Sequence, residues 1–429
     1  MDIYVVQPGD TIYSIADRYG VNAEKLVKDN ELFHPDSLVS GETIVITYPN
    51  LTYTVQDGDT IEEIAAYNNI TVNELLRNNP FIMDRNFIYP GEVLNISFER
   101  VRNIANHGFT NTFINRGTLV KTLPYLTHLT VINYRNTRNG DVIALEDDTL
   151  VLQLAREYNV TPLLLLTTAT VQGDIDLETT YEILIDENIQ NRLFENILRI
   201  VRERGYSGVN ISAQYITSSN QSLFYSYISN ISGRLRSEGF LTMITINPRI
   251  EASNNEVAFE QIVYSEIGEL VDAVLFLQYR WGYNFGPPSP VISVYNYNVF
   301  LDYVLPQIAS DKIFVGIPAL GYDWELPYTP RFSTASVLTI EAIIDLAQTY
   351  HSTIEFDLSS QTPYFHYMSA DGISHEVRFV NATTVHSFVQ MLIEKGITGT
   401  GVWNIMNYFT QFWLVINNQY RVIKLLPEN

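Results

Sequence analysis

The chain has 429 residues and no cysteine, and its 48 acidic side chains against 26 basic ones give a formal net charge of −22. The absence of Cys excludes a disulfide framework, a thiolate nucleophile and a Cys-ligated zinc site, and the acidic excess disfavours nucleic acids and anionic membranes as partners, because phosphates would repel it. The start lacks the basic and apolar regions of a secretory signal, and no apolar run reaches the roughly 18 residues of a membrane-spanning helix, so we expect neither.

The chain opens with an internal repeat. The segment Tyr4–Ile12 returns as Tyr53–Ile61, about 49 residues later, with the same Gln and the same Gly-Asp-Thr. In each copy two short amphipathic helix patterns follow, the second closing in an Asn, and a Gly-led apolar strand ends the unit. The closing residues are Asn30 and Asn78, and the strands are Gly41–Ile46 and Gly91–Ile96. The pattern predicts the order strand, helix, helix, strand, with Asp10 and Asp59 as caps of the first helix.

This repeat resembles the LysM module, a βααβ domain that binds glycans containing N-acetylglucosamine, such as peptidoglycan and chitin. Ordinary βααβ packing would explain the apolar spacing, but not the repeated Gly-Asp-Thr. We therefore predict one module at 1–49 and a second at 50–98. The resemblance implies a shallow sugar groove between the first strand–helix loop and the loop before the last strand. By position these loops hold Gly9, Asp10, Thr11 and Leu38 in the first module, and Gly58, Asp59, Thr60 and Ile88 in the second.

Residues 99–429 alternate short apolar strands with amphipathic helices, which indicates an α/β fold class and a (β/α)8 TIM barrel. The helices include Val257–Leu270 and Val299–Ile308. A hairpin pattern around Asp371-Gly372 breaks the rhythm and predicts a small α+β insertion, at about 325–382, between strands seven and eight. The eight predicted strands are Val101–Ala105, Leu129–Tyr134, Leu163–Thr168, Gly208–Ile211, Leu241–Ile246, Ala273–Gln278, Ile313–Ile317 and Gly399–Trp403.

Chemistry in such a barrel lies at the C-terminal ends of the strands. There the chain resembles the family 18 glycoside hydrolases, in particular the spore cortical-fragment-lytic hydrolases that join two LysM modules to a barrel. The family's strand-four motif is D-G-x-[ND]-[IFL]-D-[FWY]-E. Gly208 and Asn210 fit this motif, but acids are usual at the positions held here by Ser207, Ser212 and Gln214.

Three further motif positions lie on two later strands. On strand six Tyr279 is kept, whereas Arg280 replaces the usual Asp. On strand eight Trp403 matches the Trp that floors the sugar site in the family. The resemblance therefore implies an intact sugar platform beside an altered set of acids.

The expected activity depends on Gln214. In this family a Glu protonates the glycosidic oxygen while the substrate's own acetamido oxygen attacks the sugar. A Gln amide cannot release a proton, and the loss of acid catalysis alone costs about 10²–10⁴-fold. The four changed positions predict an inactive homologue with no catalytic, metal-binding or cofactor-binding residues. Sugar binding in the cleft is still expected, through Gln214, Tyr279, Trp403, Trp281 and Tyr134.

The leading hypothesis is thus a non-catalytic glycan-binding protein of the spore coat, spore cortex or cell wall. It would be made in the mother-cell cytoplasm without a signal peptide and bind peptidoglycan through its LysM modules, with spore-coat proteins as further partners. One alternative is an active N-acetylglucosaminidase that acts on spore-cortex fragments with relocated catalytic groups. Asp323 and Glu325, at the end of strand seven, could be proposed as replacement acids, but the similar hydrolases also carry an acid at the Asp323 position, which favours a structural or rim role. Another alternative is a structural spore-coat protein in which protein–protein contacts dominate.

Overall fold

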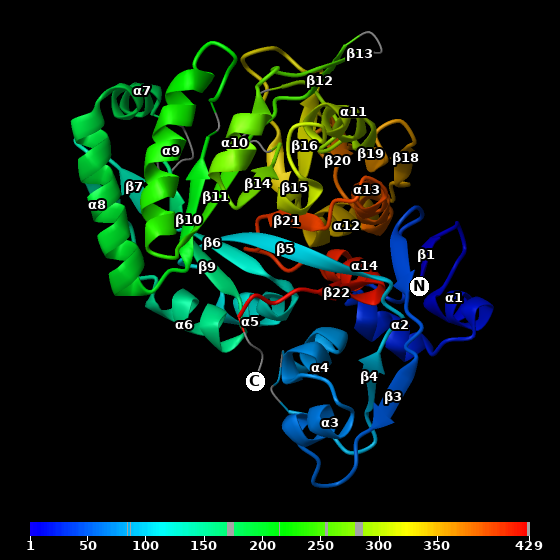
Figure 1. Cartoon of the computed structure of the whole chain (residues 1–429). Helices are drawn as coiled ribbons and strands as arrows, with labels where there is room; N and C mark the ends of the chain where they lie inside the picture. Colours follow the sequence, from blue (N-terminus) through cyan, green and yellow to red (C-terminus); the bar gives the residue numbers. More distant parts are fainter. Residues whose placement is uncertain are drawn as a thin grey trace.

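The protein is described here by a computed structural model that covers residues 1–83, 85, 87–169, 176–213, 215–253, 256–278 and 286–426. Two small modules at the N-terminus lie on the same side of a large barrel, next to α14 (Thr410–Gln419) (Figure 1). No helix in these ranges is long and apolar enough to cross a bilayer. Nor does any group of three or more His, Asp or Glu side chains within them come close enough to hold a metal ion.

Both modules have the predicted order of strand, helix, helix and strand. The first contains β1 (Asp2–Val5), α1 (Ile12–Tyr19), α2 (Ala23–Asn30) and β2 (Thr43–Ile46), and the second contains β3 (Leu51–Thr54), α3 (Ile61–Tyr67), α4 (Val72–Asn78) and β4 (Val93–Ser97). In each module the two strands pair antiparallel. The apolar helix faces and the closing strand bury a common core, for example Ile15, Leu26 and Ile44 in the first module.

The helix caps differ from the prediction. The hydroxyls of Thr11 and Thr60, not the carboxylates of Asp10 and Asp59, accept a hydrogen bond from the backbone N–H of the third residue of α1 and α3. The Asp side chains instead close the preceding turn: Asp59 accepts hydrogen bonds from the Tyr53 hydroxyl at 2.9 Å and from the Gln56 amide at 2.7 Å. Thr lies one residue closer to the helix, where its hydroxyl reaches the third helical N–H.

The repeated Asn is also one residue away from the predicted position in the second module. Asn30 donates to the Val45 carbonyl and accepts from its amide, both at 2.8 Å. Asn79 makes the same two bonds to Asn95, again at 2.8 Å. Asn79, rather than Asn78, is therefore the counterpart of Asn30, and this pair of bonds ties the second helix to the last strand in each module.

The eight predicted barrel strands are confirmed. Each pairs parallel with its neighbours, and the last pairs with the first, which closes the barrel. A further strand, β22 (Tyr420–Val422), pairs parallel with the N-terminal end of the first barrel strand. In chain order the barrel strands are β5 (Arg102–Asn111), β6 (His128–Ile132), β9 (Thr161–Leu166), β10 (Gly208–Ser212), β11 (Leu241–Ile246), β14 (Ala273–Phe276), β15 (Ile313–Pro318) and β21 (Gly399–Trp403).

Helices cover the outside of the barrel (Figure 1). They are α5 (Arg116–Thr122), α6 (Thr149–Glu157), α7 (Leu177–Ile185), α8 (Glu187–Arg204), α9 (Gln221–Ser237), α10 (Tyr264–Leu270), α11 (Val294–Val304), α13 (Ala382–Glu394) and α14. The helix prediction for Val257–Leu270 is wrong in its first half, because Val257 belongs to β13 (Glu256–Ala258), which pairs with β12 (Glu251–Ser253). The helix predicted at Val299–Ile308 begins earlier, where Ser293 caps α11.

A five-stranded antiparallel sheet and one helix form the predicted α+β insertion between strands seven and eight of the barrel. The hairpin around Asp371-Gly372 is confirmed as β19 (Thr362–Met368) and β20 (Ser374–Arg378). The remaining elements are β16 (Gly321–Leu326), β17 (Ser336–Leu338), α12 (Ile340–Thr349) and β18 (Glu355–Asp357). The core of the insertion includes Val39 of the first module, so the two units share a hydrophobic contact.

Candidate functional site

The fourth barrel strand presents a buried polar side chain to the barrel interior. Because side chains alternate along a strand, Val209 and Ile211 of β10 join the outer core, whereas Asn210 faces inward. The Asn210 amide donates to the Thr130 hydroxyl at 3.0 Å, and its carbonyl accepts from the Thr245 hydroxyl at 2.9 Å. Thr130 in turn contacts the His107 ring at 2.9 Å. A continuous polar row therefore crosses strands one, two, four and five.

This row carries no charge near neutral pH. Burial, together with the neighbouring His128, holds the pKa of His107 well below its usual range. Burial lowers the pKa of His128 to about 4. An amide at position 210 satisfies both hydroxyls without placing an ion in a dry interior. The sequence motif identified Asn210, but its partners come from distant strands and could not be read from the spacing.

The structure separates two of the predicted site positions. Ser207 lies at the N-terminal end of β10, where its amide donates to the Pro162 carbonyl at 2.9 Å. Ser212 ends the same strand, beside Thr245 of β11. Ser212 also lines a small pocket of about 30 Å³ together with Thr168 and Thr180. Only Ser212 is thus at the end of the barrel where chemistry is expected.

Trp403 closes the barrel interior at that end. It is the last residue of β21, is only 5% exposed, and joins an apolar cluster with Leu277, the residue that follows strand six. Its ring centroid lies 5.0 Å from that of Phe109. The rings are tilted by 58° and Phe109 is only 1% exposed, so Phe109 packs behind Trp403 in the barrel interior.

Tyr134 belongs to a separate buried network. It begins β7 (Tyr134–Asn136), which pairs with β8 (Val142–Ala144), and its hydroxyl donates to Asp148 at 2.8 Å. Burial would raise the pKa of Asp148, but hydrogen bonds from Tyr206, Arg204 and Tyr134 outweigh it and lower that pKa. Asp148 therefore stays ionised, and the Tyr134 hydroxyl is engaged with it. Gln214, Tyr279, Arg280 and Trp281 lie outside the described residues.

Two carboxylates after the barrel strands are already engaged. Asp323 accepts from the Tyr367 hydroxyl at 2.8 Å and pairs with the His375 ring at 2.9 Å, inside the insertion. Glu260 accepts two hydrogen bonds of 2.7 Å from the amide and hydroxyl of Ser218, and these lower its pKa. Neither arrangement resembles an acid with a proton to transfer.

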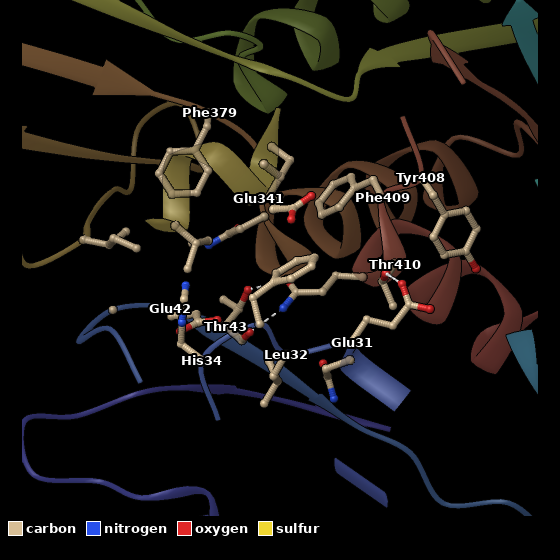
Figure 2. A pocket seen from close by; sticks show the side chains of 18 residues that line it. Glu31, Leu32, His34, Glu42, Thr43, Glu341, Phe379, Tyr408, Phe409 and Thr410 are labelled. Atoms are coloured by element: carbon tan, nitrogen blue, oxygen red, sulfur yellow. Dashed lines mark hydrogen bonds between the residues drawn. The ribbon is translucent and has the colours of Figure 1, made fainter. Parts of the chain in front are cut away.

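The predicted groove residues of the two modules lie in matching places with different surroundings. Gly9 and Gly58 have nearly equal positive φ angles of 87° and 89° and open surroundings. Leu38 packs against the core of its own module, and Ile88 packs partly buried against the main core. The loop that holds Leu38 borders a pocket of about 90 Å³ between the first module, α12 and α14 (Figure 2). Sequence reasoning missed this contact, since nothing in the repeat indicates which face meets the barrel.

The chain resembles known proteins along its whole length. The family model described as glycosyl hydrolases family 18 matches residues 109–407, and the LysM domain model matches 4–47 and 53–97. A protein named cortical fragment-lytic enzyme from Bacillus subtilis (strain 168) is 31% identical over 99% of both chains, and one of the same name from Bacillus anthracis is 30% identical over 99% of both. The crystal structure of the Bacillus megaterium QM B1551 spore cortex-lytic enzyme SleL superposes with a TM-score of 0.80 at 26% identity, covering 99% of each chain.

These relatives overturn the expectation of an inactive homologue. That prediction is wrong, because proteins that match this chain from end to end are named as lytic enzymes. The altered residues of strand four show that the family's usual acid is absent from position 214. They do not by themselves exclude hydrolysis by another route.

Proposed function

The chain belongs to glycosyl hydrolase family 18, and we propose that it is a glycosidase that cleaves N-acetylglucosamine-containing fragments of spore-cortex peptidoglycan. The observation that carries the proposal is the 31% identity, over 99% of both chains, to a protein named cortical fragment-lytic enzyme. In this proposal the LysM modules at 1–49 and 50–98 bind the glycan and the barrel at 99–429, with its insertion at about 325–382, performs the chemistry. The spore cortex is its place of action, and spore-coat protein partners stay a prediction.

The chemistry we propose uses the substrate as its own nucleophile. In substrate-assisted hydrolysis the acetamido oxygen of the sugar attacks the anomeric carbon while the bond from that carbon to the glycosidic oxygen breaks, and water then opens the cyclic intermediate. The leaving oxygen takes a proton from the protein, so the protein supplies orientation and a proton rather than a nucleophile. Trp403, backed by the buried Phe109, is our candidate for the apolar floor under the sugar ring. Ser212, at the end of strand four, is suited to hydrogen bonding with a bound acetamido group, whereas the buried Thr245 hydroxyl already donates to Asn210.

The proton must come from a group other than Gln214, because an amide cannot act as a general acid. Asp148, Asp323 and Glu260 are committed to other hydrogen bonds. Exposed carboxylates remain on the β12–β13 hairpin that follows strand five, at Glu251 and Glu256 (Figure 1). We propose that the general acid is an Asp or Glu of these C-terminal loops, with Glu251 and Glu256 as the first candidates.

The test is a pair of isosteric changes in the full chain. Turnover of cortical muropeptides by Glu251→Gln and Glu256→Gln is compared with turnover by the unchanged chain, using mass spectrometry of the products. Loss of the general acid is expected to lower the rate by about 10²–10⁴-fold in one of the two variants. Exposed side chains leave folding intact, which thermal unfolding checks. Equal rates in both variants would remove the two candidates, and an unchanged chain that releases no product would refute the proposed function.

A further inference from the structure

We infer that the two LysM modules are not equivalent: the second module carries the bound glycan, whereas the barrel insertion closes the matching loop of the first. This inference rests on the glycan binding proposed above and adds which module performs it. The two modules share one sequence pattern, so they can be compared position by position. Ser37, Val39, Gly41 and Glu42 of the first correspond to Phe87, Tyr89, Gly91 and Glu92 of the second.

In the first module residues 39–41, which lead into the last strand, pack against the insertion. The Val39 side chain is only 6% exposed and lies in the hydrophobic core that includes Phe365 and Phe379. The Ile354 amide donates to the Ser40 carbonyl at 2.9 Å. A Cβ atom on Gly41 would overlap the Ile354 carbonyl oxygen. A glycan that used this loop as one wall of its groove would have to displace the insertion.

Polar contacts around the same loop hold the first module in this position. The Thr43 hydroxyl donates to the Gln411 side chain of α14 at 2.7 Å. Glu31 pairs with Lys121 and accepts from the Thr410 hydroxyl, and Figure 2 shows Glu31 and Thr410 turned toward each other across the pocket. His34 contacts Asp345 of α12 at 2.7 Å. These contacts come from three different elements, so the loop is held by more than one hydrophobic residue.

In the second module the matching loop is exposed. Phe87 is 47% and Tyr89 is 53% exposed, and their ring centroids lie 5.0 Å apart in an edge-to-face arrangement. A Cβ atom on Gly91 would meet nothing within 4 Å. The second module reaches the barrel through its helix α4 instead, where Glu74 pairs with Arg100. This contact leaves the loop with Phe87 and Tyr89 on the surface.

The exposed aromatic pair is suited to a sugar. Aromatic faces stack on the C–H groups of pyranose rings, and an amphipathic Tyr adds a hydroxyl for hydrogen bonding. Arg85 lies over both rings, 5.5 Å from the centre of Phe87 and 5.0 Å from that of Tyr89, and adds N–H donors. The Arg85 side chain also donates to the Phe87 carbonyl at 2.8 Å, which orders the loop before any ligand binds. Gly58, in the first loop of this module, has open surroundings.

Glu42 and Glu92, which occupy the same position in the two modules, also differ in their surroundings. Burial would raise the pKa of Glu92, but hydrogen bonds from Arg85 and the Tyr89 amide, with Lys28 nearby, lower it. Burial raises the pKa of Glu42 to about 7, although a hydrogen bond from the Val39 amide and the nearby His34 act against this. One glutamate thus lies at a charged surface and its counterpart lies in a closed interface.

The experiment uses the full chain and chitopentaose as the probe. Amide signals of Gly9 and Gly58, which occupy the same position in the two modules, are followed by NMR during titration. We expect chitopentaose to shift the Gly58 signal and leave the Gly9 signal unchanged. The double variant Phe87→Ser, Tyr89→Val loses the aromatic pair and carries the first module's residues at the same positions. It is expected to weaken the binding seen at Gly58 by about tenfold.

Several results would overturn the inference. They are a shift of Gly9 at the same chitopentaose concentration as Gly58, an undiminished affinity at Gly58 in the double variant, or no shift of either signal. The control variant Ser37→Phe places an aromatic ring in the first module, where binding should not follow, because the neighbouring loop stays closed. Binding is read from the module amide signals and not from products, so its failure is distinguishable from a failure of the proposed hydrolysis.

Discussion

Adding a methyl group at Gly41 tests the contact between the first module and the insertion, and Gly91 provides a matched control. Both glycines have a φ of +88°, so Gly41→Ala and Gly91→Ala share the same backbone strain. Only at Gly41 would the new methyl group meet another unit of the protein, at the Ile354 carbonyl. The difference between the two variants therefore isolates the interface.

The magnitude follows from two separate costs. A left-handed conformation costs an L-residue roughly 1–2 kcal/mol, and this applies to both variants. Overpacking a tight contact adds about 1–3 kcal/mol, and this applies only to Gly41→Ala. The interface should consequently open about 5- to 150-fold more often in Gly41→Ala than in Gly91→Ala.

Hydrogen exchange measures the opening of the interface and the backbone strain at different amides. The Ile354 amide, bonded to the Ser40 carbonyl at 2.9 Å, reports the interface. The Val6 and Val55 amides, bonded to the carbonyls of Glu42 and Glu92 at 2.9 Å, report the strain within each module. We expect Ile354 to lose protection in Gly41→Ala alone. Equal protection of Ile354 in the two variants would refute the packing described for this interface.

Three further predictions concern charge, the barrel interior and the altered acid. The pKa of Glu42 is raised from 4.5 to about 7 in the folded chain, so folding favours the protonated carboxyl. The protonated carboxyl therefore contributes to stability below pH 4.5, and this contribution is lost as the pH rises toward 7. The protection of the Ile354 amide against hydrogen exchange, corrected for the intrinsic exchange rate, should then fall by the equivalent of roughly 2–3 kcal/mol between pH 4.5 and 7.5. Glu42→Gln should abolish this pH dependence, whereas Glu92→Gln should not. Replacing Asn210 by Ala leaves the Thr130 and Thr245 hydroxyls without their amide partner. The free energy of unfolding, measured by thermal unfolding, should fall by about 2–4 kcal/mol. A loss below about 0.5 kcal/mol would contradict the hydrogen bonds described for the polar row. Gln214→Glu restores a carboxyl at the position of the family's acid. Added to whichever of Glu251→Gln and Glu256→Gln has lost turnover, it should recover kcat/KM on a chitooligosaccharide by about 10²-fold, and no recovery would show that this position no longer faces the scissile bond.

Much of the architecture can be predicted from the sequence because it rests on local patterns. The repeated Gly-Asp-Thr and the period of the apolar residues predict both modules, and eight apolar runs predict the closed barrel. The cap prediction failed by one residue, since Asp10 and Thr11 are both good caps by type and only the geometry of the turn separates them.

Long-range contacts account for the rest. The partners of Asn210 come from strands 35 and 80 residues away, and Val39 meets an insertion near the other end of the chain. No local pattern encodes such pairings. The strand-four motif likewise identifies a missing acid at Gln214 but carries no information about a replacement on another loop. The inference from the four changed positions to inactivity was therefore too strong.

The central claim, that this chain hydrolyses N-acetylated glycans, is tested most directly by incubating the purified full chain with cortical muropeptides and following the products by mass spectrometry. The account predicts fragments with new N-acetylglucosamine reducing ends, released in proportion to time and to the amount of protein. A product profile identical to that of the heat-inactivated chain would contradict it.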